Sequence, residues 1–88
     1  MWTVMIKRRM ERKIAELPQG IQDRFAALKT DLENDGPVQP SWSNYSRLSE
    51  TRHHCHLTYR YVACWQVLSN NEMTMEVYYV GSRENAPY

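Results

Sequence analysis

The first part of the chain has the hydrophobic spacing of a short strand followed by a helix. Residues 2–6 are mostly apolar and partly β-branched, which is typical of a strand. Over residues 7–17 the apolar positions recur at steps of four and three, which places them on one stripe of a helix that ends before Pro18: Met10, Ile14 and Leu17. The pattern predicts a strand and then a short amphipathic helix.

A second helix is predicted to begin at Pro18, because the missing N–H of proline costs nothing in the first helical turn. Its apolar positions again repeat at helical spacing: Ile21, Phe25, Leu28 and Leu32. Gly36 favours a left-handed helix end, and Pro37 prevents continuation. The two helices should form a hairpin with one apolar face.

After an irregular connection at residues 37–44, the period of the pattern changes to two, which predicts strands. Three strand candidates and a shorter fourth are present: residues 52–57, 59–68, 73–80 and 44–48. Between the last two long candidates, Asn70 and Asn71 tolerate the positive φ that a tight hairpin demands. The second half of the chain is therefore predicted to be an antiparallel meander.

Alternation within these strands indicates which side chains face the helices. One set is more apolar and is predicted to form the core: Cys55, Leu57, Tyr61, Ala63, Trp65, Val67, Met73, Met75, Val77 and Tyr79. The alternate set is predicted to form an uncovered face: Arg52, His54, His56, Arg60, Val62, Cys64 and Gln66. The predicted fold class is α+β, with an N-terminal strand, a two-helix hairpin and an antiparallel three- to four-stranded sheet packed on the helices.

Composition adds that residues 1–88 should form a single folded domain, with 42% hydrophobic and 24% charged residues. Cys55 and Cys64 lack the spacing of a disulfide framework or a redox motif, so both thiols are expected to be reduced. The N-terminal charges follow the apolar stretch, the reverse of a signal peptide, and no apolar run approaches the ~20 residues of a membrane span. We expect a cytoplasmic protein without a membrane partner.

The formal net charge of +1 argues against binding to nucleic acid by bulk charge alone. Positive charge is concentrated instead near the N-terminus, in a basic run with five members: Lys7, Arg8, Arg9, Arg12 and Lys13. The helix dipole disfavours cations in the first turns of a helix, so this run is a candidate phosphate-binding surface. A solvated helix face without function is the equal alternative.

All three histidines lie within four residues: His53, His54 and His56. On a strand, His54 and His56 project from the same side, roughly 6.5 to 7 Å apart. Because histidine titrates near neutrality, one imidazole can take a proton from a hydroxyl and another can return one to a leaving group. Arginines accompany this pair on the same face or after the last strand: Arg52, Arg60 and Arg83. The set suits RNA transesterification, which needs a base, an acid and a cation for the phosphorane, and no metal.

Two other interpretations of the histidine pair stay open, namely a solvated strand face without chemistry and part of a metal site. An H-x-H pair supplies two ligands, whereas a structural zinc ion needs four. Cys55 is expected on the opposite face and cannot complete such a site. We therefore predict neither a metal nor another cofactor.

Several stretches of the chain resemble the RelE family of bacterial toxin–antitoxin ribonucleases. LPQGIQDRFAALKTDLENDGP is similar to the second helix of that family, NYSRL to its entry into the catalytic sheet, and YVACWQV to its central strand. The ending VYYVGSRENAPY is similar to its closing strand and tail. These stretches cover nearly the whole chain, and the H-C-H before the central strand is most similar to the HigB and phage-derived Gp49-like branch.

The resemblance implies cleavage of messenger RNA in the ribosomal A site, contact with 16S rRNA and neutralisation by a cognate, DNA-binding antitoxin. By position it implies that His54 and His56 are base and acid, that Arg83 stabilises the phosphorane and that Tyr88 orients the nucleotide. The arginine that many members carry on the central strand falls on Val62. RNA contacts would come from the remaining basic residues: Lys7, Arg8, Arg9, Arg12, Lys13, Arg52 and Arg60.

Two alternatives from other classes are a non-catalytic, ParE-like toxin that inhibits DNA gyrase and an inactive relic that only binds an antitoxin. The histidine pair and Arg83 favour the nuclease, because a gyrase inhibitor needs neither. The sequence leaves open the codon preference, which imidazole is the base, the antitoxin and its groove, and the oligomeric state.

Overall fold

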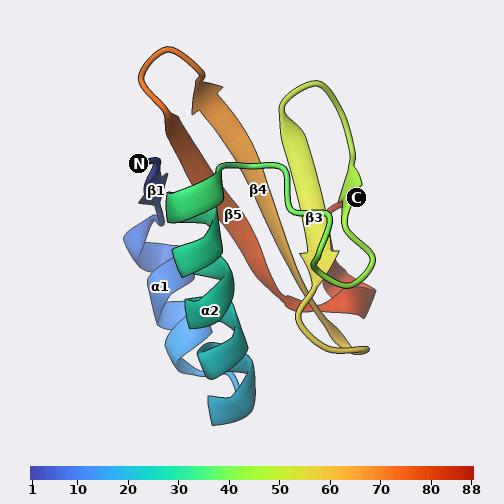
Figure 1. The fold of residues 1–88 in the computed structure, drawn as a ribbon. Coiled ribbons are helices and arrows are strands. Elements are labelled where there is room, and N and C mark those ends of the chain that lie inside the picture. Colours follow the sequence, from blue (N-terminus) through green and yellow to red (C-terminus); the bar gives the residue numbers. More distant parts are fainter.

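The computed structural model describes residues 1–88 and contains two helices and five strands, followed by a single 3-10 turn. In chain order these are β1 Thr3–Met5, α1 Arg8–Ala15, α2 Gln19–Asp35, β2 Ser46–Arg47, β3 Arg52–His56, β4 Tyr61–Ser69, β5 Thr74–Ser82 and η1 Arg83–Asn85. Figure 1 shows both helices against one face of the sheet. The α+β class and the helix hairpin are as predicted.

The sheet has the order β1-β5-β4-β3-β2 and is mixed rather than purely antiparallel. β2, β3, β4 and β5 form the predicted meander, with antiparallel pairing throughout. β1 adds a fifth strand, because the helix hairpin returns the chain so that Thr3 pairs with Thr74 in a parallel register. The expectation of three to four antiparallel strands therefore missed this one parallel pair.

The core lies between the helices and the sheet. α2 contributes the predicted stripe, and all four of its members are buried: Ile21, Phe25, Leu28 and Leu32. The sheet side contributes fully buried side chains, including Leu57, Trp65 and Met75. Each fully buried side chain of this size stabilises the fold by roughly 1.5–3 kcal/mol relative to exposure. Neither helix combines the length and the apolar character that a transmembrane segment requires.

The end of α2 is set by Gly36, which has a φ of 89°. A Cβ at this position would lie 2.9 Å from Trp2 Nε1, so the site requires glycine for its conformation and for its space. Trp2 also donates its backbone N–H to the Glu33 carbonyl oxygen at 2.8 Å. The close approach of Trp2 thus attaches the start of the chain to the end of α2.

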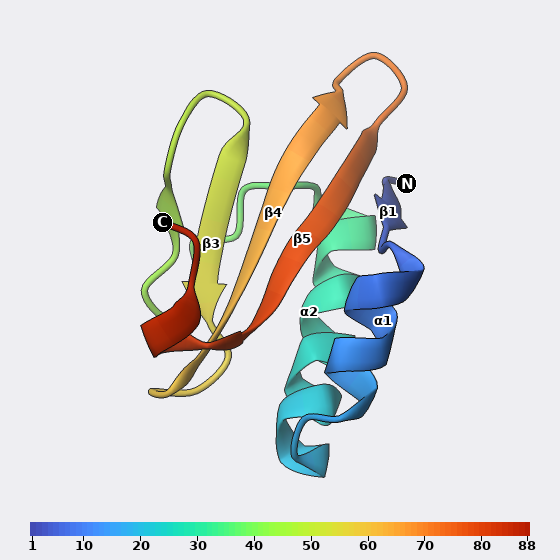
Figure 2. The same ribbon diagram turned by 180° about the vertical axis from the view of Figure 1, so that it is seen from behind.

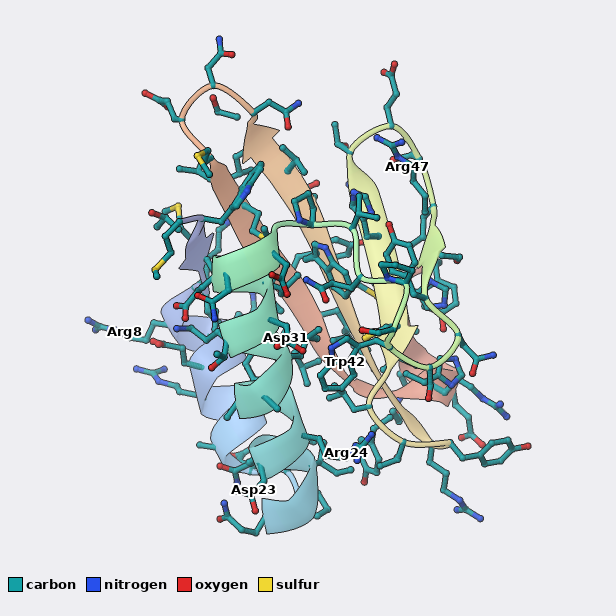
Figure 3. All side chains as sticks on the ribbon, in the orientation of Figure 1. Arg8, Asp23, Arg24, Asp31, Trp42 and Arg47 are labelled. Carbon is teal, nitrogen blue, oxygen red and sulfur yellow. The ribbon has the colours of Figure 1, made fainter.

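The connection between α2 and the sheet is held by tryptophans. Trp42 donates its indole N–H to Asp31 Oδ2 at 2.8 Å, and the Arg24 guanidinium lies 5.8 Å from its ring centre. Figure 3 shows Trp42 between these two side chains of α2. Trp65 donates its indole N–H to the Pro37 carbonyl oxygen at 3.0 Å. Trp42 is therefore half-buried and packs against the core.

A β-bulge in β5 changes which side chains of this strand enter the core. Cys64 pairs with Tyr79 but the next residue, Trp65, pairs with Val77, so Tyr78 is an extra residue. An extra residue reverses the alternation, and Val80, rather than Tyr79, enters the core. Periodicity alone does not reveal a bulge, and the assignment of Tyr79 to the core was wrong.

The β4–β5 turn also differs from its prediction. Positive φ occurs at Met73, with a value of 52°, and not at Asn70 or Asn71. Met73 donates its backbone N–H to the Asn70 carbonyl oxygen at 3.2 Å, and its side chain is 38% exposed. Because Met73 belongs to the turn, it does not enter the core that strand alternation predicted.

The face of the sheet away from the helices is only partly open. Val62 and Cys64 have no exposed surface, although both lie on the face predicted to be uncovered. Figure 2 shows the chain after β5 turning back across this side toward β3. The C-terminal tail, residues 83–88, therefore covers the part of the sheet that contains these two residues.

Candidate active site

The site begins with two alternate residues of β3. His54 and His56 project from the same face, with ring centres 5.9 Å apart and ring planes at 61°. The strand pairing holds them in place, because His54 lies opposite Cys64 and His56 opposite Val62. Two imidazoles at this separation can both reach one phosphodiester group.

His54 is enclosed on two sides. Ser46 Oγ of the neighbouring strand β2 lies 3.0 Å from its Nδ1, at hydrogen-bonding distance. The Tyr88 ring lies over it, with ring centres 4.6 Å apart, and only 8% of His54 is exposed. The tail thus covers one of the two predicted catalytic imidazoles.

His56 is more accessible and lies nearer the arginine. It lines a cleft of about 320 Å³ that it shares with Arg24 and Tyr59. The Arg83 guanidinium lies over the same Tyr59 ring, 4.6 Å from its centre. The positive charge of Arg83 also acts on the His56 imidazole. The structure therefore brings His54, His56, Arg83 and Tyr88 to one end of the sheet.

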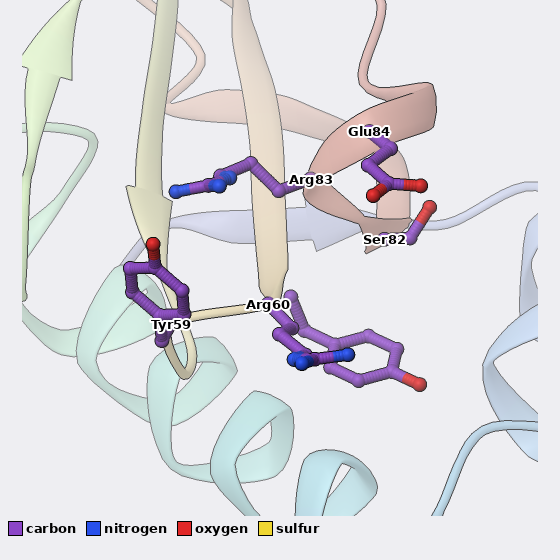
Figure 4. A pocket seen from close by; sticks show the side chains of 6 residues that line it. Tyr59, Arg60, Ser82, Arg83 and Glu84 are labelled. Carbon is purple, nitrogen blue, oxygen red and sulfur yellow. The ribbon is translucent and has the colours of Figure 1, made fainter.

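A second cleft, of about 300 Å³, adjoins Arg83 (Figure 4). Its lining contains Arg60 and Arg83 together with Ser82 and Glu84. Arg83 donates its backbone N–H to the Arg60 carbonyl oxygen at 2.7 Å, which ties the two segments together. Two guanidinium groups and a hydroxyl in one polar cleft can accommodate a phosphate.

Tyr79 and Gly81 set the direction in which the chain leaves β5. The Tyr79 hydroxyl donates to the Ser82 carbonyl oxygen at 2.7 Å. A Cβ at position 81 would lie 2.8 Å from that hydroxyl oxygen, so a larger residue would displace the Tyr79 side chain. This contact precedes Arg83 directly and orients the start of the tail.

The surroundings lower the pKa of both imidazoles. For His54 the main cause is burial; a hydrogen bond with the Ser46 backbone raises its pKa, and His56 lowers it further. For His56 burial is again the main cause, and the Arg83 charge adds to it. Both groups are therefore mainly neutral at pH 7, which suits a proton acceptor. Burial raises the pKa of Tyr88, so its phenol keeps its proton.

His53 has a different environment from its two neighbours. It lies on the helix side of β3 and is only 1% exposed. Its ring packs against Tyr45 and Trp65, with centre distances of 5.9 and 6.0 Å, and those two rings lie 6.2 Å from each other, so the three form a triangular cluster. Its Nδ1 lies 2.7 Å from the Tyr45 hydroxyl, and its Nε2 is buried without a partner. His53 is a core residue and not part of the site.

Arg52 lies two positions before His54 on β3, on the same face, at the end of the strand away from His56. Its guanidinium lies 5.2 Å from the centre of the Tyr78 ring, and its Nε donates to Gln66 Oε1 at 3.3 Å. Strand alternation placed Arg52 on this face, but the bulge that presents Tyr78 there has no sequence signal. Tyr59, in the β3–β4 turn, was likewise not predicted.

The basic run is exposed and lies on α1 and the residue before it, away from the histidine pair. Its members are Lys7, Arg8, Arg9, Arg12 and Lys13. Arg8 projects outward from α1 (Figure 3). Lys7 Nζ lies 3.8 Å from Glu76 Oε2. The structure therefore does not bring this run to the imidazoles, and its role in RNA binding stays a prediction.

No group of three or more His, Cys, Asp or Glu side chains converges in a way that could hold a metal ion. Cys55 and Cys64 are both free and buried. Burial raises the pKa of each thiol to about 12, which keeps both protonated and unreactive.

No family model matches this chain, and no curated protein matches its sequence. Solved structures do. The chain is similar to an archaeal RelE-RelB complex from Pyrococcus horikoshii, with a TM-score of 0.75, 15% identity and coverage of 97% of this chain and 98% of that chain. It is also similar to a metal-bound toxin from Helicobacter pylori, with a TM-score of 0.68, 17% identity and coverage of 96% and 97%. The chain therefore has the fold of RelE-like toxins.

Proposed function

We propose that this protein is the toxin of a bacterial type II toxin–antitoxin system and cleaves messenger RNA on the ribosome. The observation that carries the proposal is the convergence of two imidazoles, 5.9 Å apart, with Arg83 and Tyr88 at one end of the sheet. The RelE-like fold and the resemblance to the HigB and Gp49-like branch support the same function.

The reaction proceeds without a metal. One imidazole takes the proton of the ribose 2′-hydroxyl, whose oxygen attacks the adjacent phosphorus. Arg83 stabilises the charge of the resulting phosphorane. The bond to the 5′-oxygen then breaks, and the other imidazole gives that oxygen a proton. Because the pKa of both imidazoles is lowered, only the minor fraction of molecules that carries a proton on this imidazole is ready to react at pH 7. The products are a 2′,3′-cyclic phosphate and a free 5′-hydroxyl.

The two imidazoles differ in their surroundings, which suits one as proton acceptor and the other as proton donor, in either order. His56 is the more accessible of the two, whereas His54 lies beneath Tyr88. Tyr88 has a protonated hydroxyl and an aromatic face, so it can orient the substrate nucleotide. Arg60, in the cleft beside Arg83, can hold a flanking phosphate and take the place of the arginine that the family carries where this chain has Val62.

The partners follow from the same function. The ribosome positions the message, 16S rRNA contacts the basic run, and an antitoxin blocks the site in the cytoplasm. The similar solved structure of a RelE-RelB complex supports a protein partner for this fold. Coverage of the clefts beside His56 and Arg83 is the most direct way to neutralise such a nuclease.

The test is a double variant, His54→Ala together with His56→Ala, which removes both imidazoles. General acid–base catalysis contributes roughly 10²- to 10⁴-fold per group, so mRNA cleavage by the double variant should fall below detection. Cleavage is measured by primer extension on messenger RNA in a purified translation system, and folding by circular dichroism. Arg47→Gln, on an exposed residue of β2, is the matched control.

A folded double variant that cleaves as fast as the wild type would remove the histidines from the mechanism. Intact mRNA together with gyrase-dependent DNA damage would indicate a ParE-like toxin instead. Expression of the wild type without harm or cleavage would indicate a relic that binds only an antitoxin.

A further inference from the structure

The sheet face continues beyond the histidine pair into a region that the tail leaves open. Here the exposed Arg52 guanidinium lies 5.2 Å from the Tyr78 ring centre, a cation–π arrangement. Gln66 accepts a hydrogen bond from Arg52 Nε at 3.3 Å and holds the guanidinium in place. A planar cation supported by an aromatic ring thus lies two residues along β3 from His54.

The β5 bulge accounts for the position of Tyr78. Because Tyr78 is the extra residue between the pairs Cys64–Tyr79 and Trp65–Val77, it leaves the regular alternation. Its hydroxyl lies beside the thiol of Cys64, the residue paired with His54. A regular strand would have hidden one of these two adjacent tyrosines in the core, whereas the bulge presents both on the same face as His54.

A cluster of positively charged side chains lies next to Tyr78, at the edge of β5 that faces α1. The pairing of β1 with β5 ends at Glu76, so the following edge of β5 faces α1. A small cleft of about 120 Å³ lies there, and Tyr78 shares it with three members of the basic run: Lys7, Arg9 and Lys13. Glu76 also lines this cleft but has Lys7 as a partner at 3.8 Å. The cleft therefore carries an excess of positive charge.

We propose that Arg52 and Tyr78 form a stacking platform for a base of single-stranded RNA next to the scissile phosphate, and that Lys7, Arg9 and Lys13 bind phosphates beyond it. This assignment rests on the nuclease function proposed above. The tract then runs from His54 and His56 across β4 and β5 to α1. Along this tract, Tyr78 lies between the basic run at one end and the histidine pair at the other.

The chemistry favours a single strand over other ligands. Bases splayed from a single strand stack on aromatic rings and on guanidinium planes, and their phosphates follow positively charged grooves. A duplex keeps its bases stacked on one another and cannot use the platform. Stacking tolerates every base, so the tract should add affinity with little sequence preference.

The first experiment measures binding by the full chain to a short 2′-O-methylated RNA, which lacks the attacking hydroxyl and is not cleaved. Tyr78→Phe keeps the ring and should bind as the wild type does. Tyr78→Leu and Arg52→Lys each remove one planar group, and each should weaken binding roughly tenfold, within the range of one stacked base. Arg52→Lys keeps the charge, so a weaker affinity in this variant separates stacking from electrostatics.

Nuclear magnetic resonance reports on both binding and folding. Addition of the RNA should shift the signals of Tyr78, Arg52 and Lys13, and the variants should keep the dispersed spectrum of the folded protein. Equal affinity for Arg52→Lys and the wild type, or no shift at Tyr78, would overturn the platform. If Tyr78→Leu does not fold, Arg52→Lys still decides the outcome.

A cleavage assay separates failure of the platform from failure of the nuclease function. If the wild type cleaves mRNA and Arg52→Lys cleaves at the same rate, the platform is wrong and the nuclease function stands. If the wild type does not cleave, the nuclease function fails, and RNA binding at Tyr78 is judged by the binding experiment alone.

Discussion

At the scale of single residues, the neighbouring histidines of β3 show how strand geometry separates chemically identical groups. His53 packs in a cluster with Tyr45 and Trp65 on the helix side, whereas His54 and His56 face the tail. The pKa of all three is lowered, with burial as the main cause for each. The same three groups therefore titrate below the ordinary value for histidine, for the same reason but with different consequences.

The lowered pKa values predict a decrease in stability in acid. The unfolded chain takes up protons near the ordinary histidine pKa of 6.5, whereas the folded chain resists them. The free energy of unfolding should therefore be highest above pH 6.5 and should decrease as the pH falls below that value. Urea denaturation between about pH 8 and pH 5 measures this change.

His53 should account for much of this effect, because its ring is buried against Tyr45 and Trp65 and its Nε2 has no partner, so the protonated imidazole would be poorly solvated. His53→Phe keeps a flat ring in the same space and should reduce the acid sensitivity. An equally steep fall in the variant would assign the effect to His54 and His56 instead.

At the scale of elements, the C-terminal tail decides how open the site is. The sheet alone would expose the imidazole of His54, but Tyr88 lies over it at a ring-centre distance of 4.6 Å. The tail also carries Arg83, so one segment both supplies the cation of the site and restricts access to a histidine. A substrate that uses His54 must share its space with Tyr88 or displace it.

Removal of the Tyr88 ring should raise the pKa of His54. In Tyr88→Ala, water reaches the imidazole, so burial, the main cause of the lowered pKa, is reduced. The change is measured by following the imidazole proton signals during a pH titration in nuclear magnetic resonance. His53, which the tail does not touch, is the internal control, and an unaltered His54 pKa would show that the tail does not cover it in solution.

At the scale of the whole molecule, the chain is almost neutral yet strongly polarised. Its formal net charge is +1, but the five cations of the basic run lie together at and before α1. Arg9 and Lys13 lie one helical turn apart and reach the cleft beside Tyr78, whereas Arg8 and Arg12 form a second ridge that is absent from its lining. If the proposed function holds, the ridge of Arg9 and Lys13 contacts the message and the ridge of Arg8 and Arg12 contacts 16S rRNA.

The second ridge should contribute to ribosome binding through counterion release. Replacement of Arg8 and Arg12 by Gln should weaken co-sedimentation with ribosomes. It should also reduce the slope of log affinity against log salt concentration by about 0.7 to 0.9 for each phosphate that the variant no longer neutralises. Arg47→Gln removes one exposed charge elsewhere and is the control. An unchanged salt slope would mean that this ridge is only a solvated helix face.

The amino-acid sequence by itself determined the local features of this protein. Helical spacing located both helices, Gly36 located the end of the second, and alternation placed His54 and His56 on one face of a strand. These features follow from the 3.6- and 2-residue periods of the backbone, so a short window of sequence contains all the information they require.

Only the tertiary structure decided what each side chain meets. The parallel pairing of β1 with β5, the bulge at Tyr78 and the burial of His54 beneath Tyr88 depend on segments that are far apart in the chain. Such contacts depend on how several elements pack at once, and a bulge shifts the alternation without any change in composition. The pair of imidazoles was therefore predictable from the sequence, whereas its cover and its neighbouring platform were not.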